Sequence, residues 1–361
     1  MANSAQISNN SSLMSGNIGG LLFRNNFDAS CLRTHSDNSS PFHVNGVLRQ
    51  EEFERFDDVV IRAGRERLNA VADVHARGLT TDLPNPLGYT QYTWTVSNSM
   101  EAAVHTMDGR NNDKNDARNL TQNSIPIPIT HKDFEIDSRT LHASRNGNQP
   151  LDTWQAEDAS RGVSEALEDA YLNGIPGLQV NGNTVSGILN QANRIQNVHG
   201  SAPALAKGYS ATNWSDNVAT TGNEIYSDVV AMKADLHANQ FYGPKVLYIP
   251  TNVESRFDEL LNPSNSSNIT IRDAVLKLDT IDAIIVVDQL PDSTYTLVSM
   301  DSGTVQIIDG MSNNVLQWSS LDSLVFYFKV MAIQPPLIRD RLNKAGTRVS
   351  GIVQLTGPIG P

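Results

Sequence analysis

The sequence predicts an α+β fold, in which helices and strands mix along the chain without a regular alternation. Three long segments carry apolar residues three and four positions apart, which indicates amphipathic helices. The last third of the chain instead mixes short strand-like runs with short helices and a hairpin pattern, unlike a regular doubly wound sheet. No segment recurs at a fixed period, so the pattern does not favour a solenoid or a propeller.

Composition limits the class of protein. With 361 residues, 39% hydrophobic and 18% charged, the chain can bury a sizeable core. The formal net charge of −12 argues against a protein whose main task is binding nucleic-acid phosphates. A single cysteine, Cys31, excludes an intramolecular disulfide framework and suits synthesis in a reducing compartment. We expect neither a secretory signal nor a membrane span, since the longest aliphatic run is residues 283–287.

The first elements of the chain are an arm and a helix. Residues 1–50 are rich in Asn, Ser and Gly, and we interpret them as an arm that lies over its own subunit or over a neighbour. Residues 51–77 predict one long amphipathic helix, which Gly78 ends as a C-cap. Residues 92–96 alternate apolar and threonine side chains and predict a strand.

A second strand, with the sequence SIPIPI, follows a polar stretch. Ile125, Ile127 and Ile129 occupy alternate positions and would share one face of this strand. Pro126 and Pro128 lack backbone donors, which would prevent further strands from adding at one edge. Strand, polar tip and strand together predict a long two-stranded ribbon.

The ribbon needs a surface to lie on, because a two-stranded ribbon is marginally stable in water. We therefore expect the three isoleucines to contact a neighbouring subunit. Alternation changes parity after Ile129, which predicts a bulge or bend at residues 130–133. In the polar tip at residues 108–119, no register fits the EF-hand calcium loop. Its cations are available for carboxylates on an acidic partner, and another copy of this chain would serve; they are Arg110, Lys114 and Arg118.

The remaining elements follow in order. Residues 151–173 predict a second long helix, with Asp152 as N-cap and Gly174 just after its end. Residues 174–213 are rich in Gly and Asn, and a third helix has Ile225, Val229, Met232 and Leu236 on its buried side. After it we expect strands at 245–249, 283–287 and 324–333, helices at 254–261 and 271–278, and a hairpin of 295–300 with 304–308.

Motifs that carry chemistry are missing. The sequence contains no phosphate-binding loop, no dinucleotide fingerprint, no nucleophile elbow and no H-E-x-x-H zinc motif. Its eight histidines have no close ligand spacing. The acidic pairs Asp57-Asp58 and Glu168-Asp169 are interpreted as solvated helix faces. We therefore predict no catalytic residue, no metal, no cofactor and no enzyme activity.

One run is similar to a known family. Residues 125–174, IPIPITHKDFEIDSRTLHASRNGNQPLDTWQAEDASRGVSEALEDAYLNG, resemble the encapsulin and linocin branch of the tailed-phage capsid superfamily. The shared features are the proline-bearing strand, the alternating segment 133–137, a Pro-x-Asp helix start, and an acidic pair before a closing glycine. Residues 182–190, GNTVSGILN, and residues 242–253, YGPKVLYIPTNV, are also similar.

This resemblance implies the Hong-Kong-ninety-seven-like capsid fold. It divides the chain into an N-terminal arm (1–50), an N-terminal helix and start of the peripheral domain (51–88), an extended loop (89–133), a peripheral domain with the spine helix (134–214), an axial domain (215–315), and a return to the peripheral domain with a C-terminal tail (316–361). The spine helix corresponds to residues 152–173.

The resemblance also implies a function. It suggests a major capsid protein of a tailed double-stranded DNA bacteriophage, which self-assembles into pentamers and hexamers of an icosahedral shell. The protein would be made in the host cytoplasm and reside in the virion. It would enclose DNA without sequence-specific binding, contact portal, scaffolding or decoration proteins, and have no membrane partner. The long polar arm, the longer loop tip and a tail at 342–361 favour this reading over the alternative, an encapsulin-like bacterial nanocompartment that holds a cargo enzyme.

Overall fold

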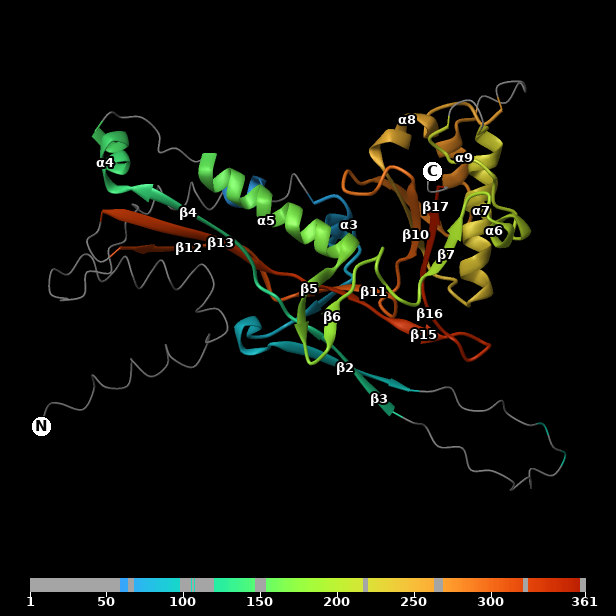
Figure 1. The fold of residues 1–361 in the computed structure, drawn as a ribbon, viewed down its shortest axis with the longest axis horizontal. Coiled ribbons are helices and arrows are strands. Elements are labelled where there is room, and N and C mark those ends of the chain that lie inside the picture. Colours follow the sequence, from blue (N-terminus) through green and yellow to red (C-terminus); the bar gives the residue numbers. More distant parts are fainter. Residues whose placement is uncertain are drawn as a thin grey trace, which may run out of the picture.

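The computed structural model describes residues 59–63, 68–97, 105, 107, 120–146, 154–216, 220–262, 269–320 and 324–357. Figure 1 shows two lobes that meet in the middle of the molecule, with a two-stranded ribbon leading away from the junction. A long helix lies along the left lobe, and shorter helices gather around the sheet of the right lobe. The predicted α+β class is confirmed.

The left lobe is a long helix packed on a three-stranded antiparallel sheet. Every second residue of the central strand, from Phe326 to Ala332, faces the helix and packs against its apolar stripe. The spacing of apolar residues in this helix predicts a buried stripe of Ala159, Val163, Ala166, Leu167 and Ala170, and all of these except Ala166 are buried. Gly174, with a φ of 70°, ends the helix where a Cβ atom would meet the Val185 carbonyl at 2.3 Å. The elements are α5 (Trp154–Asn173), β4 (Thr130–Asp137), β12 (Met311–Ser319) and β13 (Val325–Ile333), with α4 (Ser138–Asn146) after β4.

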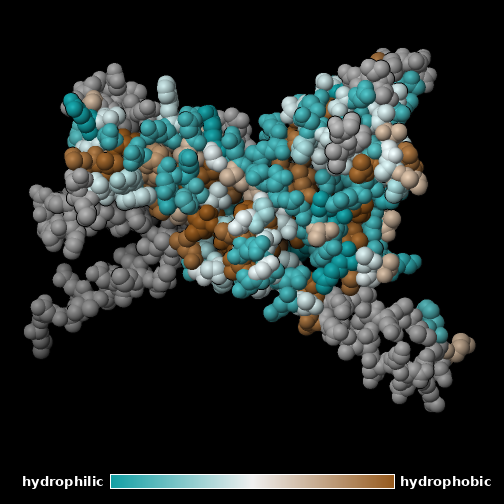
Figure 2. All heavy atoms as spheres, in the orientation of Figure 1, coloured by the Kyte–Doolittle hydropathy of each residue, from teal (hydrophilic) through white to brown (hydrophobic). Residues whose placement is uncertain are grey.

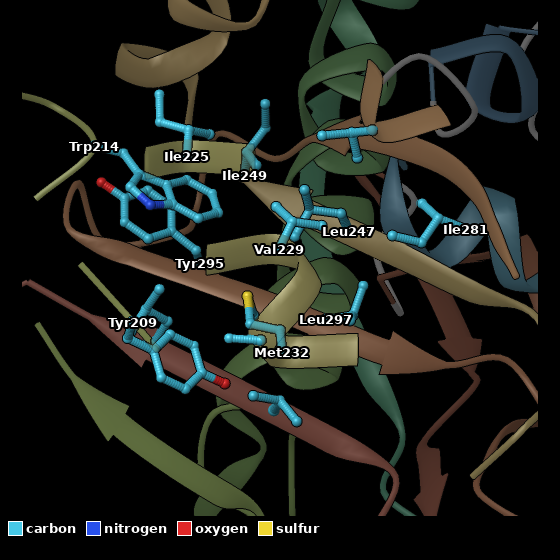
Figure 3. Close-up of a cluster of buried hydrophobic side chains, with 14 of the residues drawn as sticks. Tyr209, Trp214, Ile225, Val229, Met232, Leu247, Ile249, Ile281, Tyr295 and Leu297 are labelled. Carbon is cyan, nitrogen blue, oxygen red and sulfur yellow. The ribbon is translucent and has the colours of Figure 1, made fainter. Parts of the chain in front are cut away.

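The right lobe is a mixed five-stranded sheet with helices beside it. Figure 3 shows the core of this lobe, in which Trp214 and Tyr295 lie together near the apolar side of α7. The predicted apolar positions of α7 are all fully buried, from Ile225 to Leu236. In sheet order, the strands are β7 (Ile195–Val198), β17 (Ile352–Thr356), β10 (Thr294–Ser299), β8 (Lys245–Ile249) and β9 (Ile281–Val286). The helices are α6 (Ala202–Ala206), α7 (Gly222–Ala238), η2 (Thr251–Val253), α8 (Glu254–Phe257) and α9 (Ile271–Leu276).

Small elements fill the junction between the lobes. A three-stranded sheet and helix α3 pack beside the C-terminal end of α5, and two hairpins extend the lower side of the molecule (Figure 1). These elements are α3 (Ala70–Ala76), β1 (Thr80–Asp82), η1 (Pro86–Gly88), β11 (Val305–Asp309) and β14 (Pro336–Ile338), and the hairpins β5 (Ile175–Val180) with β6 (Asn183–Val185) and β15 (Asp340–Leu342) with β16 (Arg348–Ser350).

Two predicted features of the last third are wrong. Residues 295–300 and 304–308 do not form a hairpin, because β10 pairs with β8 and β17, whereas β11 pairs with β1 and β14 in another sheet. The expected tail from residue 342 is not a tail over its described part, which ends at residue 357. β17 lies between β7 and β10, and Ile352, Val353 and Leu355 are fully buried. Apolar residues on both faces of a strand suit a position inside a sheet.

The predicted helix at 51–77 is interrupted in its described part. Residues 59–63 are helical, residues 68 and 69 are not, and α3 begins at Ala70. Gly78 follows the helix with a φ of 69°, in agreement with the predicted C-cap position. Asp57 and Asp58 lie outside the described residues.

Glu168 corrects the prediction of a solvated acidic pair. Its side chain is only 3% exposed, and its carboxylate accepts the backbone N–H groups of Ala70 at 2.7 Å and Val71 at 3.2 Å. These N–H groups have no partner within α3, so a residue of α5 caps the N-terminus of α3. Burial raises the pKa of the Glu168 carboxyl, although these hydrogen bonds act in the opposite direction. Asp169 is exposed, as predicted.

Replacing Glu168 is expected to loosen this junction. Glu168→Ala should lower the free energy of unfolding by about 1–3 kcal/mol, because it leaves buried N–H groups without an acceptor. Asp169→Ala is the matched control and should change it by less than about 0.5 kcal/mol. Urea unfolding followed by circular dichroism measures both, and equal effects would contradict the capping role.

The same side chain predicts a pH dependence. Because the pKa of Glu168 in the folded state lies above its unfolded value of about 4.3, its stabilising contribution is full below that pH and is lost as the pH rises through the folded pKa. The stability of the wild type relative to Glu168→Gln should therefore fall as the pH rises above about 4.3. A difference that stays constant with pH would contradict the raised pKa.

Candidate assembly surfaces

The ribbon consists of β2 (Gln91–Ser97) and β3 (Leu120–Pro126), which pair antiparallel from Gln91 opposite Pro126 to Ser97 opposite Leu120. Figure 1 shows it leading away from both lobes, and no third strand pairs with it among the described residues. The predicted ribbon is confirmed, but its second strand spans residues 120–126 rather than the predicted 124–129. The three tip cations proposed as contacts, Arg110, Lys114 and Arg118, lie outside the described residues.

Two of the three isoleucines contradict the expectation of a contact with a neighbour. Ile125 and Ile127 are each 8% exposed within a single subunit. Ile127 packs with Met311, Met331 and Ile333, so it anchors the base of the ribbon to the subunit's own strands. Ile125 and Ile127 share a buried side as predicted, whereas Ile129 lies beyond the end of β3 and is not part of it. Alternation alone does not tell which body covers that side.

Ile125 lies in an adjacent cluster with Ile308 and Leu337. Ile129 differs from both, since 48% of it is exposed, and it stays a candidate for contact with another copy.

Pro126 is placed as the edge prediction requires, whereas Pro128 lies between β3 and β4 and is part of neither strand. The N–H of Ile127 donates to the Thr90 carbonyl at 3.0 Å, so the backbone N–H of residue 127 points toward the chain that leads into β2. Pro126, one residue earlier, therefore lacks its N–H on the outer edge of β3. The predicted bulge at 130–133 is wrong, because β4 pairs with β13 without a slip from Thr130 to Asp137. Parity changes instead at residues 127–129, which lie between the two strands.

The exposure of several apolar side chains was not predicted from the sequence. Figure 2 shows apolar side chains gathered over the middle of this face of the molecule. Leu120, at the far end of β3, is 70% exposed, and Tyr89, at the base of the ribbon, is 50% exposed. On the left lobe, Leu324 is 62% exposed and Trp318 is 44% exposed. Leu120 and Trp318 each stand between polar residues, so no periodic signal identifies them, and nothing in the apolar run that Leu324 begins shows that Leu324 is exposed.

The face of the left sheet that is opposite α5 carries aromatic and charged side chains. Trp318 and Tyr327 stack at 5.8 Å between ring centroids, and the Lys329 ammonium lies 5.9 Å from the Trp318 ring. The same ammonium is 3.5 Å from Asp133 on β4. These groups alternate along each strand with the buried residues that pack on α5, as the pleat requires.

A Ser, a His and an Asp side chain, the residue types of a catalytic triad, lie together in the right lobe, but their cluster is buried. Asp228 accepts the Trp214 indole N–H at 2.6 Å and the Ser210 hydroxyl at 2.7 Å, and its carboxylate lies 3.9 Å from His199 Nδ1. The side chains of His199 and Asp228 are 0% exposed. Burial lowers the pKa of His199 and raises that of Asp228. A substrate cannot reach this cluster, and its hydrogen bonds hold the loop before α7 against that helix.

Metal and membrane features are also missing from the described part of the chain. No group of three or more His, Cys, Asp or Glu side chains there could hold a metal ion. No helix in the described ranges is long and apolar enough to cross a membrane.

Two lobes, a long helix on a three-stranded sheet and a projecting ribbon define a class of fold that solved structures share. The virus-like particle from Pyrococcus furiosus is similar with a TM-score of 0.55 and 13% identity, over 84% of this chain and 99% of that chain. The capsid of Myoviridae phage XM1 is similar with a TM-score of 0.56 and 15% identity, over 78% of this chain and 91% of that one. The chain therefore has the Hong-Kong-ninety-seven-like capsid fold, as the resemblance implied.

A structure of Mycobacterium phage Adephagia has a TM-score of 0.54 and 11% identity, over 84% of this chain and 91% of that one. Residues 44–340 match the family described as "Family of unknown function (DUF6260)", and the chain belongs to that family. No curated protein matches the sequence.

Proposed function

We propose that this protein is the major capsid protein of a tailed double-stranded DNA bacteriophage and assembles into the pentamers and hexamers of an icosahedral shell. The observation that carries the proposal is the fold shared with the XM1 capsid over 78% of this chain. On this proposal the protein is structural rather than enzymatic, and its place is the virion. The enclosed DNA is not bound by sequence, in keeping with a net charge of −12.

The proposed mechanism of assembly is geometric. The base of the ribbon is fixed to its own subunit through Ile125 and Ile127, which holds the projecting strands in one direction. Exposed apolar groups such as Leu120 and Ile129 then become buried against another copy. The tip cations Arg110, Lys114 and Arg118 would meet carboxylates of that copy. Such contacts join different surfaces of identical chains, which is the geometry that closes rings.

A second candidate is an encapsulin-like compartment that holds a cargo protein. The Pyrococcus particle favours it, because the similarity covers 99% of that chain. A capsid would carry additional contacts with portal, scaffolding or decoration proteins, whereas a compartment would carry contacts with its cargo.

Electron microscopy of the expressed protein tests both candidates. We expect closed particles, with mass photometry showing a species far above the 39.4 kDa chain. DNA inside particles purified from phage-producing cells supports the capsid, and an enclosed protein supports the compartment. A small species at every concentration would contradict both.

A further inference from the structure

The hairpin of β15 and β16 is a basic patch on an acidic chain. Residues 339–348 hold one carboxylate, on Asp340, and four cations, Arg339, Arg341, Lys344 and Arg348. The whole chain has a net charge of −12, so this short stretch has the opposite sign. A local patch of this kind favours a partner with exposed carboxylates or phosphates.

The turn of the hairpin is ordered before any partner binds. The side-chain oxygen of Asn343 accepts the N–H groups of Ala345 at 3.0 Å and Thr347 at 2.9 Å, and the Asn343 amide donates to Asn239 at 2.9 Å. Lys344 is therefore presented, exposed, on a turn that is fixed to the end of α7. Ordering in advance lowers the entropy lost on binding.

The other basic side chains support the hairpin. The Arg341 guanidinium lies 3.8 Å from the centroid of the Phe241 ring and donates to the Gln240 carbonyl. Arg348 pairs with Asp340 at 3.6 Å and keeps 30% of its side chain exposed. Lys344 is thus the cation of the hairpin with the greatest freedom to meet a partner.

A complementary surface lies on the other lobe. Asp133, Glu135 and Asp137 are exposed at every second position of β4, on the sheet face opposite α5. Asp133 already pairs with Lys329, but no cation of the described ranges pairs with Glu135 or Asp137. Glu135 stands opposite Tyr327, so an incoming cation would also meet an aromatic ring.

One copy cannot bring these two surfaces together. Figure 1 shows β15 and β16 under the right lobe, whereas the end of β4 lies at the left end of the molecule beside α4. A second copy can supply the surface that the first copy cannot reach. A contact between different surfaces at opposite ends of identical chains repeats around a ring.

We propose that the β15–β16 hairpin of one copy docks on the outer face of β4 in a second copy, with Lys344 against Glu135. The docking rests on the proposed function and names two of the surfaces through which neighbouring subunits of a shell meet. Its strength should fall with added salt, since exposed charge pairs are screened over about 10 Å at 0.1 M.

A charge swap tests the docking. Lys344→Glu and Glu135→Lys should each raise the protein concentration for half assembly by roughly 3- to 10-fold, because each places like charges in contact. The double variant restores an opposite pair and should return to within about two-fold of the wild type, as expected for coupled sites. Mass photometry measures the assembled fraction, and circular dichroism checks that each variant is folded.

Lys277→Glu, at an exposed position after α9, is the matched control, and Glu135→Lys should not rescue any defect it has. Two single variants that assemble like the wild type, or a double variant no better than either, would overturn the docking. If Lys344→Glu assembles normally and only loses affinity for double-stranded DNA, the hairpin binds phosphates and the proposal is wrong. A wild type that stays monomeric overturns the docking and the capsid function together, whereas a normal shell without rescue overturns the docking alone.

Discussion

Ile127→Asp is expected to prevent the subunit from folding stably, rather than only to impair its assembly. Ile127 is 8% exposed and packs with Met311, Met331 and Ile333, where the ribbon joins the body. Removing a buried aliphatic side chain costs about 2–5 kcal/mol, and a carboxylate without a partner adds to that cost. Because whole domains are stable by only about 5–15 kcal/mol, we expect most of the chain to be insoluble or unfolded.

Ile129→Asp is the matched control for this substitution. Ile129 lies two residues further along and is 48% exposed, so the same chemical change should lower the free energy of unfolding by less than about 1 kcal/mol. The yield of soluble protein and its circular dichroism spectrum compare the two variants. A soluble, folded Ile127→Asp subunit that fails only to form shells would contradict the burial seen here and restore the contact predicted from the sequence.

Trp214→Ala is expected to have an effect of similar size in the right lobe. Its side chain is fully buried, stacks on Tyr295 with ring centroids 4.0 Å apart, and donates its indole N–H to Asp228 at 2.6 Å (Figure 3). The free energy of unfolding should fall by about 3–5 kcal/mol, the usual cost of truncating a buried aromatic residue. Loss of a donor to a buried carboxylate adds to this cost.

One further variant separates packing from hydrogen bonding at position 214, and another serves as an exposed control. Trp214→Phe keeps an aromatic ring but removes the donor, so it should cost less than Trp214→Ala. Trp154→Ala, at a position that is 75% exposed, should change the free energy of unfolding by less than about 1 kcal/mol. Urea unfolding of unassembled subunits measures all three, and equal losses for Trp214→Ala and Trp154→Ala would contradict the assigned core.

The elements that the sequence predicted well are those with a strong local period. The buried sides of α5 and α7 followed from apolar residues three and four apart, and β8 was placed by a continuous apolar run. The ribbon of β2 and β3 followed from alternation and from Pro126, although β3 begins and ends earlier than predicted. These signals are local, because side-chain direction repeats with the backbone geometry of a helix or a strand.

Partners that lie far apart in the sequence were not predicted. Glu168 was taken as solvated, because nothing near it shows that α3 brings two free N–H groups to its carboxylate. β17 was taken as part of a tail, although its burial follows once β7 and β10 lie on either side of it. β10 and β11 were paired because they are neighbours in the chain, whereas each joins a different sheet.

The α+β class, the resemblance to capsid proteins and the common side of Ile125 and Ile127 could all be predicted from the residues alone. That Ile125 and Ile127 pack on the subunit's own strands, and that Ile129 is exposed, follows only from the folded arrangement. The physical reason is that periodicity specifies the direction of a side chain relative to its own backbone. What covers Ile125 and Ile127 depends largely on strands that are more than 150 residues further along the chain, such as those of Met311 and Ile308.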